Sequence, residues 1–308
     1  MIHTKSFRSL FIAIILVVGH GAWVSAADDE KRAPNGGGIV YMPLVRKSGI
    51  TAGSKPIGAF HIYPTEFAST ASTYQMNATL HGVGNWWGTV EDLETAQASG
   101  FKYVTPLAEQ IGHFDYALYQ TQINGYGAIY SQLAPFIADG TLYGHSMFDE
   151  PCDGTKWNPA ITRSDIQQAA SYSKQQLPGV LVTFGAGDCL DPNKMGLSPQ
   201  DGVDYPTIPY TQLKGPLADY IDEQLGYMIY MGWTDPKVIL NLNVLTGGIV
   251  DPTKLAADAI YACQHPSVIM VLWWEWHGDT QGDLVEYVTT NPEYADAIRQ
   301  GTAACNGQ

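Results

Sequence analysis

Charge is scarce in this chain, and basic charge is scarcest. Only 15% of the 308 residues are charged, and 16 Lys and Arg stand against 30 Asp and Glu, which gives a formal net charge of −14. An acidic surface repels phosphate backbones and anionic lipid headgroups. We therefore expect neither nucleic acid nor an anionic membrane as a partner, whereas neutral ligands are unaffected.

The N-terminal apolar run is too short to span a bilayer. Leu10–Val18 has nine residues, whereas a membrane helix needs about 20. Two basic residues precede the run, and small residues ending at Ala26 follow it, a pattern typical of a cleaved signal peptide. We predict a signal peptide over residues 1–26, a secreted or periplasmic protein without a membrane anchor, and a flexible leader over residues 27–54.

Cysteine is also rare, with Cys152, Cys189, Cys263 and Cys305 and no CxxC pair. The missing pair excludes a zinc knuckle and a thioredoxin-like motif. In an oxidising compartment an even number of cysteines indicates up to two disulfides, with buried free thiols as the alternative. We predict Cys152–Cys189, which follow neighbouring strands, and Cys263–Cys305, which end two helices.

Several catalytic signatures are missing. The sequence has no GxSxG nucleophile elbow, no HExxH and no HxH. A Gly-rich phosphate loop is also absent after the first predicted strand, where Tyr63–Glu66 reads YPTE. The missing elbow makes a serine hydrolase unlikely, and the missing phosphate loop favours a barrel over a doubly wound sheet. Without metal-binding motifs, we expect neither a metal nor a cofactor.

What the chain does have is a regular alternation of strand and helix patterns from about residue 57 to 300. Seven apolar segments are predicted as strands: Ile57–Tyr63, Phe101–Leu107, Thr141–Phe148, Val180–Ala186, Leu217–Ile221, Val238–Val244 and Val268–Trp274. An eighth is expected in Ile39–Val45 or within Thr73–Trp87.

Helix signals separate these strands. One helix is predicted over residues 89–99, a second ends at Asp139-Gly140, and a third carries Ser164 and Gln167 at capping-box spacing. Two more begin at Asp-Pro or Asn-Pro, before residues 252 and 292. Such alternation indicates βαβ units and a parallel sheet. We predict a single α/β domain over residues 55–308, a (β/α)8 TIM barrel, with an open doubly wound sheet as the alternative.

Two carboxylates directly follow the predicted strand that ends at Phe148, in the sequence Asp149-Glu150-Pro151. Active sites of parallel barrels form at the carboxyl ends of the strands. A residue before proline favours extended geometry, which would hold Glu150 at the barrel rim as a general acid. The alternative is an Asp-Glu turn that only closes the strand.

Three indoles lie close together at the end of the last strand, in the sequence Trp273-Trp274-Glu275-Trp276. Aromatic faces stack well on sugar rings. Strict alternation would place Trp274 and Trp276 on one side and Trp273 and Glu275 on the other. Trp87 would add a further stacking surface after the first strand. Packing between the barrel and its helices is the alternative for each Trp.

Polar residues also alternate with apolar ones on the strand 238–244. Asn241 and Asn243 point the same way and are predicted to bind ligand near the barrel mouth, although hydrogen bonds to backbone groups would also explain them. His61 and Tyr63 are placed in the same way on the first strand.

An Asp-Glu-Pro motif at a strand end, an Asn-rich strand running into Gly247-Gly248, and a Trp-rich last strand together resemble the TIM-barrel glycoside hydrolase superfamily, in particular poorly characterised bacterial members. The resemblance covers about residues 55–300 as a pattern. In the large retaining clan the acid/base Glu follows Asn, where this chain has Asp149. That clan also carries a nucleophilic Glu at the end of the penultimate strand, where this chain has no carboxylate.

We therefore expect a monomeric glycoside hydrolase acting on a carbohydrate, with Glu150 as proton donor and Glu275 as the partner carboxylate. Asp149, Asp188 and Glu223 are reserves for that partner. The missing carboxylate on the penultimate strand favours an inverting or atypical mechanism. A barrel that binds glycans without cleaving them is the first alternative. A metal-assisted hydrolase or lyase using His61, His145 and the carboxylates is the second.

Overall fold

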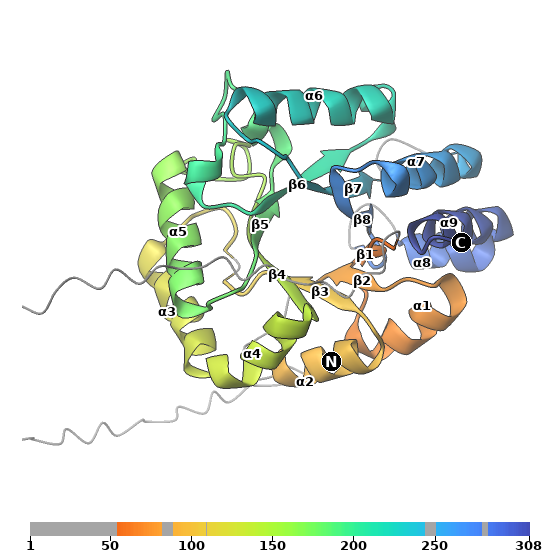
Figure 1. The fold of residues 1–308 in the computed structure, drawn as a ribbon, viewed down its shortest axis with the longest axis horizontal. Helices are drawn as coiled ribbons and strands as arrows, with labels where there is room; N and C mark the ends of the chain where they lie inside the picture. Colours follow the sequence, from red (N-terminus) through yellow and green to blue (C-terminus); the bar gives the residue numbers. More distant parts are fainter. Residues whose placement is uncertain (1–53, 82–88, 109, 244–250, 279–282) are drawn as a thin grey trace, which may run out of the picture. The chain divides into compact units, whose positions relative to one another are not determined.

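The computed structural model describes residues 54–81, 89–108, 110–243, 251–278 and 283–308. Among these residues, eight strands form one closed barrel in the order β1 to β8, with β8 paired to β1 and every neighbouring pair parallel (Figure 1). The strands are β1 Ile57–Phe60, β2 Ala78–Leu80, β3 Lys102–Thr105, β4 Leu142–Asp149, β5 Val182–Gly185, β6 Tyr205–Tyr210, β7 Val238–Asn243 and β8 Val268–Trp274. The predicted TIM barrel is confirmed.

Helices connect the strands and surround the barrel (Figure 1). The α-helices of the described residues are α1 Phe67–Tyr74, α2 Thr89–Ala98, α3 Tyr116–Ala128, α4 Tyr130–Asp139, α5 Arg163–Gln176, α6 Leu217–Tyr230, α7 Pro252–Gln264, α8 Leu284–Thr290 and α9 Pro292–Cys305. Short 3₁₀ turns lie in the connections: η1 Pro64–Glu66, η2 Gly187–Leu190, η3 Pro199–Asp201 and η4 Gln212–Lys214.

The apolar residues form two layers, as alternation along the strands requires. A small inner cluster fills the barrel and contains Phe60, Ala78, Val104, Ile239, Met270 and Leu272. A much larger cluster lies between the barrel and the helices, and Leu240, Leu242 and Trp273 belong to it. The two clusters fix which side of each strand faces the barrel interior.

One predicted strand is wrong. Leu217–Ile221 is not a strand but the start of α6, and the sixth strand is Tyr205–Tyr210. Buried side chains recur at helical spacing through all of α6, so the five-residue apolar run was one part of a helix face. The additional strand expected in Ile39–Val45 or within Thr73–Trp87 is β2, which lies in the second of these ranges.

The third predicted helix is present, but its cap is different. α5 is capped by Thr162, whose hydroxyl accepts a hydrogen bond from the backbone of Asp165, and the Asp165 carboxylate accepts one from the Thr162 backbone. The capping box is therefore two residues earlier than Ser164 and Gln167. The helices predicted to end at Gly140 and to begin at Pro252 and Pro292 are confirmed.

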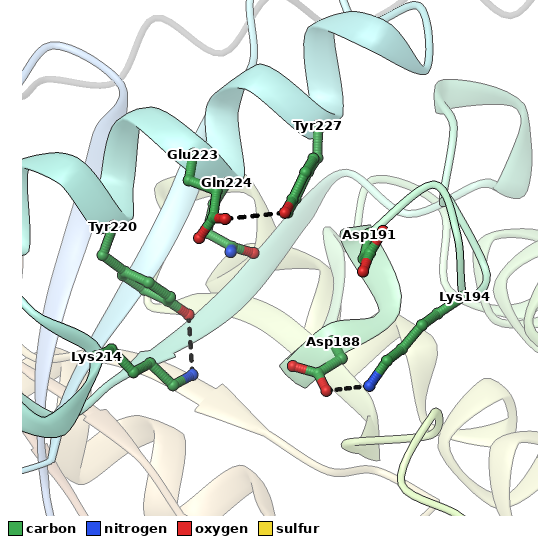
Figure 2. Close-up of a pocket in the computed structure, with 8 residues that line it drawn as sticks. All are labelled: Asp188, Asp191, Lys194, Lys214, Tyr220, Glu223, Gln224 and Tyr227. Atoms are coloured by element: carbon green, nitrogen blue, oxygen red, sulfur yellow. Dashed lines mark hydrogen bonds and ion pairs between the residues drawn. The ribbon is translucent and has the colours of Figure 1, made fainter.

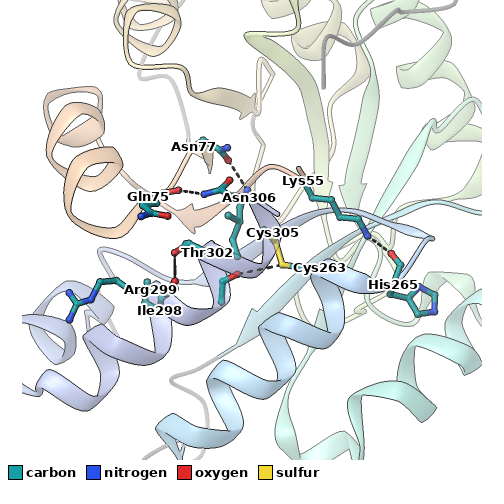
Figure 3. Close-up of a disulfide and its surroundings, with 12 residues drawn as sticks. Lys55, Gln75, Asn77, Cys263, His265, Ile298, Arg299, Thr302, Cys305 and Asn306 are labelled. Atoms are coloured by element: carbon teal, nitrogen blue, oxygen red, sulfur yellow. Dashed lines mark hydrogen bonds between the residues drawn. A yellow bond between two sulfur atoms is a disulfide. The ribbon is translucent and has the colours of Figure 1, made fainter. Parts of the chain in front are cut away.

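Both predicted disulfides are present, with Cα atoms 5.4 Å apart in Cys152–Cys189 and 4.8 Å apart in Cys263–Cys305. The first joins the loop after β4 to η2, at the carboxyl end of the barrel. The second joins the last turns of α7 and α9 (Figure 3). Among the described residues, no helix combines the length and the apolar character needed to cross a membrane.

Candidate active site

The carboxyl ends of all eight strands meet at one end of the barrel, because every strand runs in the same direction. We call the residues at and directly after these strand ends the barrel mouth. Asp149 and Glu150 lie there at the end of β4, Asn243 at the end of β7, and Glu275 directly after β8. The predicted catalytic and binding residues on β4, β7 and β8 therefore lie at the same end of the barrel.

Glu150 adopts a backbone conformation that differs from the predicted extended one. Its φ angle is 45°, in the left-handed region that residues with a Cβ atom adopt only at a cost of about 1–3 kcal/mol. Its backbone N–H donates to the carbonyl oxygen of Gly185 on β5 (2.8 Å), which fixes the turn. Backbone strain of this kind is concentrated at functional sites, and His61 at the end of β1 shows it too, with a φ of 59°.

A lysine holds both carboxylates of the β4 end. Lys156 Nζ lies 2.6 Å from Glu150 Oε2 and 2.7 Å from Asp149 Oδ2. The side chain of Asp149 is 69% exposed and that of Glu150 only 30%, so Glu150 is the more withdrawn of the two. The Trp157 indole donates to the backbone carbonyl of Asp149 (2.9 Å) and anchors the loop that carries Lys156.

Glu275 forms a buried pair with His61 across the β8–β1 junction. The Glu275 side chain is 5% exposed, and its Oε2 lies 2.9 Å from His61 Nδ1. The carbonyl oxygen of His277 lies 3.2 Å from the same nitrogen. Because both neighbours accept hydrogen bonds, Nδ1 of His61 carries a ring proton.

Aromatic rings surround this pair. The Trp274 ring lies 4.9 Å from that of Phe60 and 5.9 Å from that of His61. Tyr63, which is 44% exposed, stacks on His277 at 4.8 Å between ring centroids. His277 is in turn held by Glu66, 2.8 Å from its Nε2. The β1–β8 side of the mouth is therefore aromatic and rich in histidine.

His81, directly after β2, completes that side of the mouth. Its ring packs edge-on against Tyr63 and lies 6.0 Å from that of His61. Burial, assisted by the charges of His61 and His277, lowers the pKa of His81 to about 4. His81 is therefore neutral near pH 7 and able both to donate and to accept hydrogen bonds.

The polar face of β7 points into the barrel. Asn241 and Asn243 share the side of Ile239, which belongs to the inner cluster, whereas Leu240 and Leu242 face the helices. Asn243 pairs in register with Trp274 on β8. Among the described residues, the Asn241 amide oxygen and the Trp274 indole nitrogen are buried without a hydrogen-bond partner.

Two of the predicted stacking residues lie elsewhere. Trp276 is only 2% exposed and packs edge-on against Tyr74 of α1, between the barrel and its helices. Strict alternation ends with β8 at Trp274, so Trp276 does not share that residue's side. Trp87 lies outside the residues that the structure describes.

His145 also has a structural position. It is fully buried, its Nδ1 accepts a hydrogen bond from the Leu107 backbone (3.1 Å), and its Nε2 lies 2.9 Å from the Tyr119 hydroxyl of α3. It therefore holds the β3 connection against α3 and does not reach the mouth. Among the described residues, no group of three or more His, Cys, Asp or Glu side chains is arranged to hold a metal ion.

A charged pocket of about 390 Å³ lies between α6 and the turns that follow β5 (Figure 2). Its lining combines carboxylates, lysines and tyrosines from η2, the loop after η2, η4 and α6: Asp188, Asp191, Lys194, Lys214, Tyr220, Glu223, Gln224 and Tyr227. The two reserve carboxylates, Asp188 and Glu223, thus line one pocket. Gly187 links it to Glu150, because a Cβ atom on Gly187 would lie 3.2 Å from Glu150 Cγ.

Sequence reasoning missed the cations of the site. Lys156 and Lys214 lie in connections between strands and helices, where neither periodicity nor a motif marks them. Gln224 was missed because the preceding segment, Leu217–Ile221, was predicted as a strand, so the helix face to which Gln224 belongs was not recognised. The helical spacing of buried residues from Leu217 to Met228 was the signal that could have identified α6 and the face that lines the pocket.

Comparisons with known proteins agree on the architecture. No protein-family model and no curated protein sequence matches the chain. Among solved structures, the catalytic domain of the major endoglucanase from Xanthomonas campestris pv. campestris matches with a TM-score of 0.53 and 9% identity, over 85% of this chain and 98% of that chain. A beta-1,4-D-mannanase from Cryptopygus antarcticus matches with a TM-score of 0.52 and 10% identity, over 83% and 91%. At these identities the likeness establishes the fold alone, and that fold is the (β/α)8 TIM barrel.

Proposed function

We propose that the protein is an exported glycoside hydrolase that uses Glu150 as proton donor and Glu275 as the second carboxylate. The observation that carries the proposal is the position of both groups at the mouth of one closed barrel, directly after β4 and β8. The backbone strain at Glu150 and at His61, which contacts Glu275, adds support. The fold is that of known glycoside hydrolases.

In this scheme Glu150 gives its proton to the glycosidic oxygen as the bond to the anomeric carbon breaks. Glu275 takes a proton from the water that attacks the anomeric carbon, so one proton enters and one leaves the pair of carboxyls. Trp274 and Tyr63 offer aromatic faces to sugar rings beside Glu275. Asn241 and Asn243 offer amide groups to hydroxyls on the inner face of β7.

The ring of strands favours an inverting mechanism. β4 and β8 are four places apart in a closed ring of eight, so they lie on opposite sides of the mouth. Carboxyl groups about 6.5–9.5 Å apart leave room for a water and invert the anomeric centre, whereas about 5–5.5 Å leads to retention. We therefore expect the first product released to carry the inverted configuration.

Lys156 has a defined part in this scheme. It contacts both carboxylates of the β4 end, so it can stay on Asp149 while Glu150 turns to the glycosidic oxygen. Asp149 would then hold the lysine away from the acid. This gives the Asp of the Asp-Glu-Pro motif a role that the Asn of the retaining clan would not fill.

One observation favours the alternative, a barrel that binds glycans without cleaving them. Each proposed catalytic carboxylate already has a partner, Lys156 for Glu150 and His61 for Glu275. A protein that only binds would keep these pairs as they are. Hydrolysis requires that at least the Lys156–Glu150 pair opens.

The test is turnover of a broad panel of natural and chromogenic glycans by the wild type and by Glu150→Gln, Glu275→Gln and Asp235→Asn. Asp235 is the matched control, since it is a carboxylate paired with Lys237 just before β7, at the opposite end of the barrel. We expect Glu150→Gln to lower turnover by about 10²- to 10⁴-fold with little change in binding, and Asp235→Asn to behave as wild type. Hydrolysis by Glu150→Gln at the wild-type rate would contradict the proposal, and binding without turnover by the wild type would favour the alternative.

A further inference from the structure

The two sides of the barrel mouth differ in chemistry. The β1–β8 side carries aromatic rings and histidines, whereas the pocket between α6 and the turns that follow β5 is lined by ionic groups. In that pocket Lys214 Nζ lies over one face of the Tyr220 ring, 4.7 Å from its centroid. A neutral sugar ring would therefore find a stacking surface on one side of the mouth and charges on the other.

The charges of the pocket are not balanced. Three carboxylates face two lysines, and one of those lysines, Lys194, is paired with Asp188 (Figure 2). Lys214 Nζ donates a hydrogen bond to the Pro209 carbonyl oxygen (2.8 Å). Partial burial lowers the pKa of Lys214, although the nearby charges of Asp188 and Glu150 act in the opposite direction. The negative charge of the pocket therefore rests mainly on two other carboxylates, Asp191 and Glu223.

Asp191 and Glu223 are each held by a hydrogen bond but can still accept others. The Tyr227 hydroxyl donates to Glu223 Oε1 (2.9 Å), and the Asn193 backbone donates to Asp191 Oδ1 (2.8 Å). Each of these contacts engages only one of the two carboxylate oxygens. A carboxylate can accept about four hydrogen bonds, so Asp191 and Glu223 can still bind a cationic donor.

A buried amide adds an observation of a different kind. Gln224 is only 7% exposed, lines the pocket, and has no hydrogen-bond partner among the residues that the structure describes. Figure 2 shows its amide on the pocket side of α6, beside Glu223. The side chain is mostly buried, but its amide reaches the pocket, where it can hydrogen-bond to a polar ligand.

We propose that the pocket is a subsite for a sugar unit that carries a protonated amino group, with Asp191 and Glu223 binding the ammonium group and Gln224 a neighbouring hydroxyl. The proposal rests on the proposed function, since it names the substrate class of the same site. The formal net charge of −14 supports it, because an acidic protein attracts a polycationic glycan over a longer range.

Measuring ligand binding by a variant that does not hydrolyse the ligand tests this inference independently of catalysis. In the Glu150→Gln background, calorimetry would compare oligomers of β-1,4-linked glucosamine, their N-acetylated forms, neutral cello-oligosaccharides and anionic oligogalacturonates. We expect the glucosamine oligomers to bind about 10- to 100-fold more tightly than the others, the factor that corresponds to a hydrogen bond between charged groups. High salt should reduce that preference.

Variants locate the subsite. Asp191→Asn and Glu223→Gln should each remove most of the preference for the amine, whereas Asp222→Asn should not, although it removes one charge from the neighbouring exposed position of α6. Equal binding of the N-acetylated or neutral oligomers, tighter binding of the anionic ones, or an amine preference that survives both pocket variants would overturn the inference. Failure of the wild type to hydrolyse any glycan would instead overturn the proposed function and leave this binding result standing.

Discussion

Gly187 is the residue on which the position of Glu150 depends most directly. Its φ angle is 48°, and a Cβ atom there would lie 3.2 Å from Glu150 Cγ and 3.4 Å from its Cβ. We expect Gly187→Ala to displace the Glu150 side chain and to lower turnover by at least about tenfold, because misplaced catalytic groups are penalised steeply.

Gly232 provides the control for that substitution. It also has a positive φ, 96°, but no atom lies within 4 Å of the Cβ position. Both alanine variants should lose about 1–2 kcal/mol of unfolding free energy to backbone strain, measured by urea denaturation, and only Gly187→Ala should lose activity. Equal turnover of the two variants would show that Glu150 does not depend on this contact.

His145 makes the protein sensitive to acid. Burial lowers its pKa to about 4, from an ordinary value of 6.5 that the unfolded chain recovers. As the pH falls below about 6.5 the unfolded state takes up the proton first, so the free energy of unfolding falls until about pH 4. The loss from this one residue is up to about 3 kcal/mol.

The prediction is checked by measuring the free energy of unfolding of the wild type and of His145→Gln at pH 7 and at pH 5. The variant should be less stable at pH 7, because the hydrogen bonds to Leu107 and Tyr119 are weakened, yet it should lose less stability on acidification. His81 is common to both proteins and cancels in the difference. Parallel pH curves would show that His145 is not the titrating group.

Sequence reasoning placed side chains correctly where a regular strand fixes their direction. Asn241 and Asn243 were placed correctly on one face because alternation along β7 is regular. Beyond the strand ends the argument failed: Trp276 was assigned to the wrong side, and Glu150 to an extended conformation that it does not adopt. Those positions depend on turns whose geometry is set by contacts with neighbouring strands.

Among the elements, β6 shows why one strand escaped prediction. Its sequence contains Pro206 and Pro209, and proline argues against a strand that is paired on both sides. The strand nevertheless pairs with β5 and β7. β2 is only three residues long and carries too few positions for a pattern. Strong helix signals such as Asp251-Pro252 needed no tertiary information, since the cap acts within one turn.

The two disulfides have similar loop lengths but different positions. They close 37 and 42 residues, so the chain-entropy model assigns each a stabilisation of about 4 kcal/mol. Cys152–Cys189 ties the loop that follows Glu150 to the η2 turn beside Asp188. We expect Cys152→Ser/Cys189→Ser to lower both stability and turnover.

Cys263→Ser/Cys305→Ser is the matched comparison. That bond lies where α7 and α9 end, beside Lys55, which precedes β1 (Figure 3). It is therefore at the end of the barrel opposite the mouth. Its loss should lower the unfolding free energy by a similar amount while turnover below the melting temperature is retained. The check is thermal denaturation together with turnover at a low temperature. Equal activity losses in the two double variants would show that the first disulfide has no specific part in the site.

For the domain as a whole, the expected route to its compartment is testable. The signal pattern predicts that the exported protein begins at Ala27, and both disulfides require an oxidising compartment. Intact-mass analysis of secreted or periplasmic protein should show loss of residues 1–26 and four oxidised cysteines. Exported protein that retains residues 1–26 would contradict the signal-peptide prediction.

The start of β1 and the end of α9 are hydrogen-bonded to each other, from the Lys55 backbone N–H to the Cys305 carbonyl oxygen at 2.8 Å. Lys55 also contacts the His265 carbonyl oxygen, so this junction lies beneath the barrel, opposite the mouth. We therefore expect the domain to tolerate circular permutation. A short linker could join Gln308 to Ser54, and new ends could be placed between α3 and α4. A second protein fused after Gln308 would leave the barrel mouth open, because this junction lies at the opposite end of the barrel.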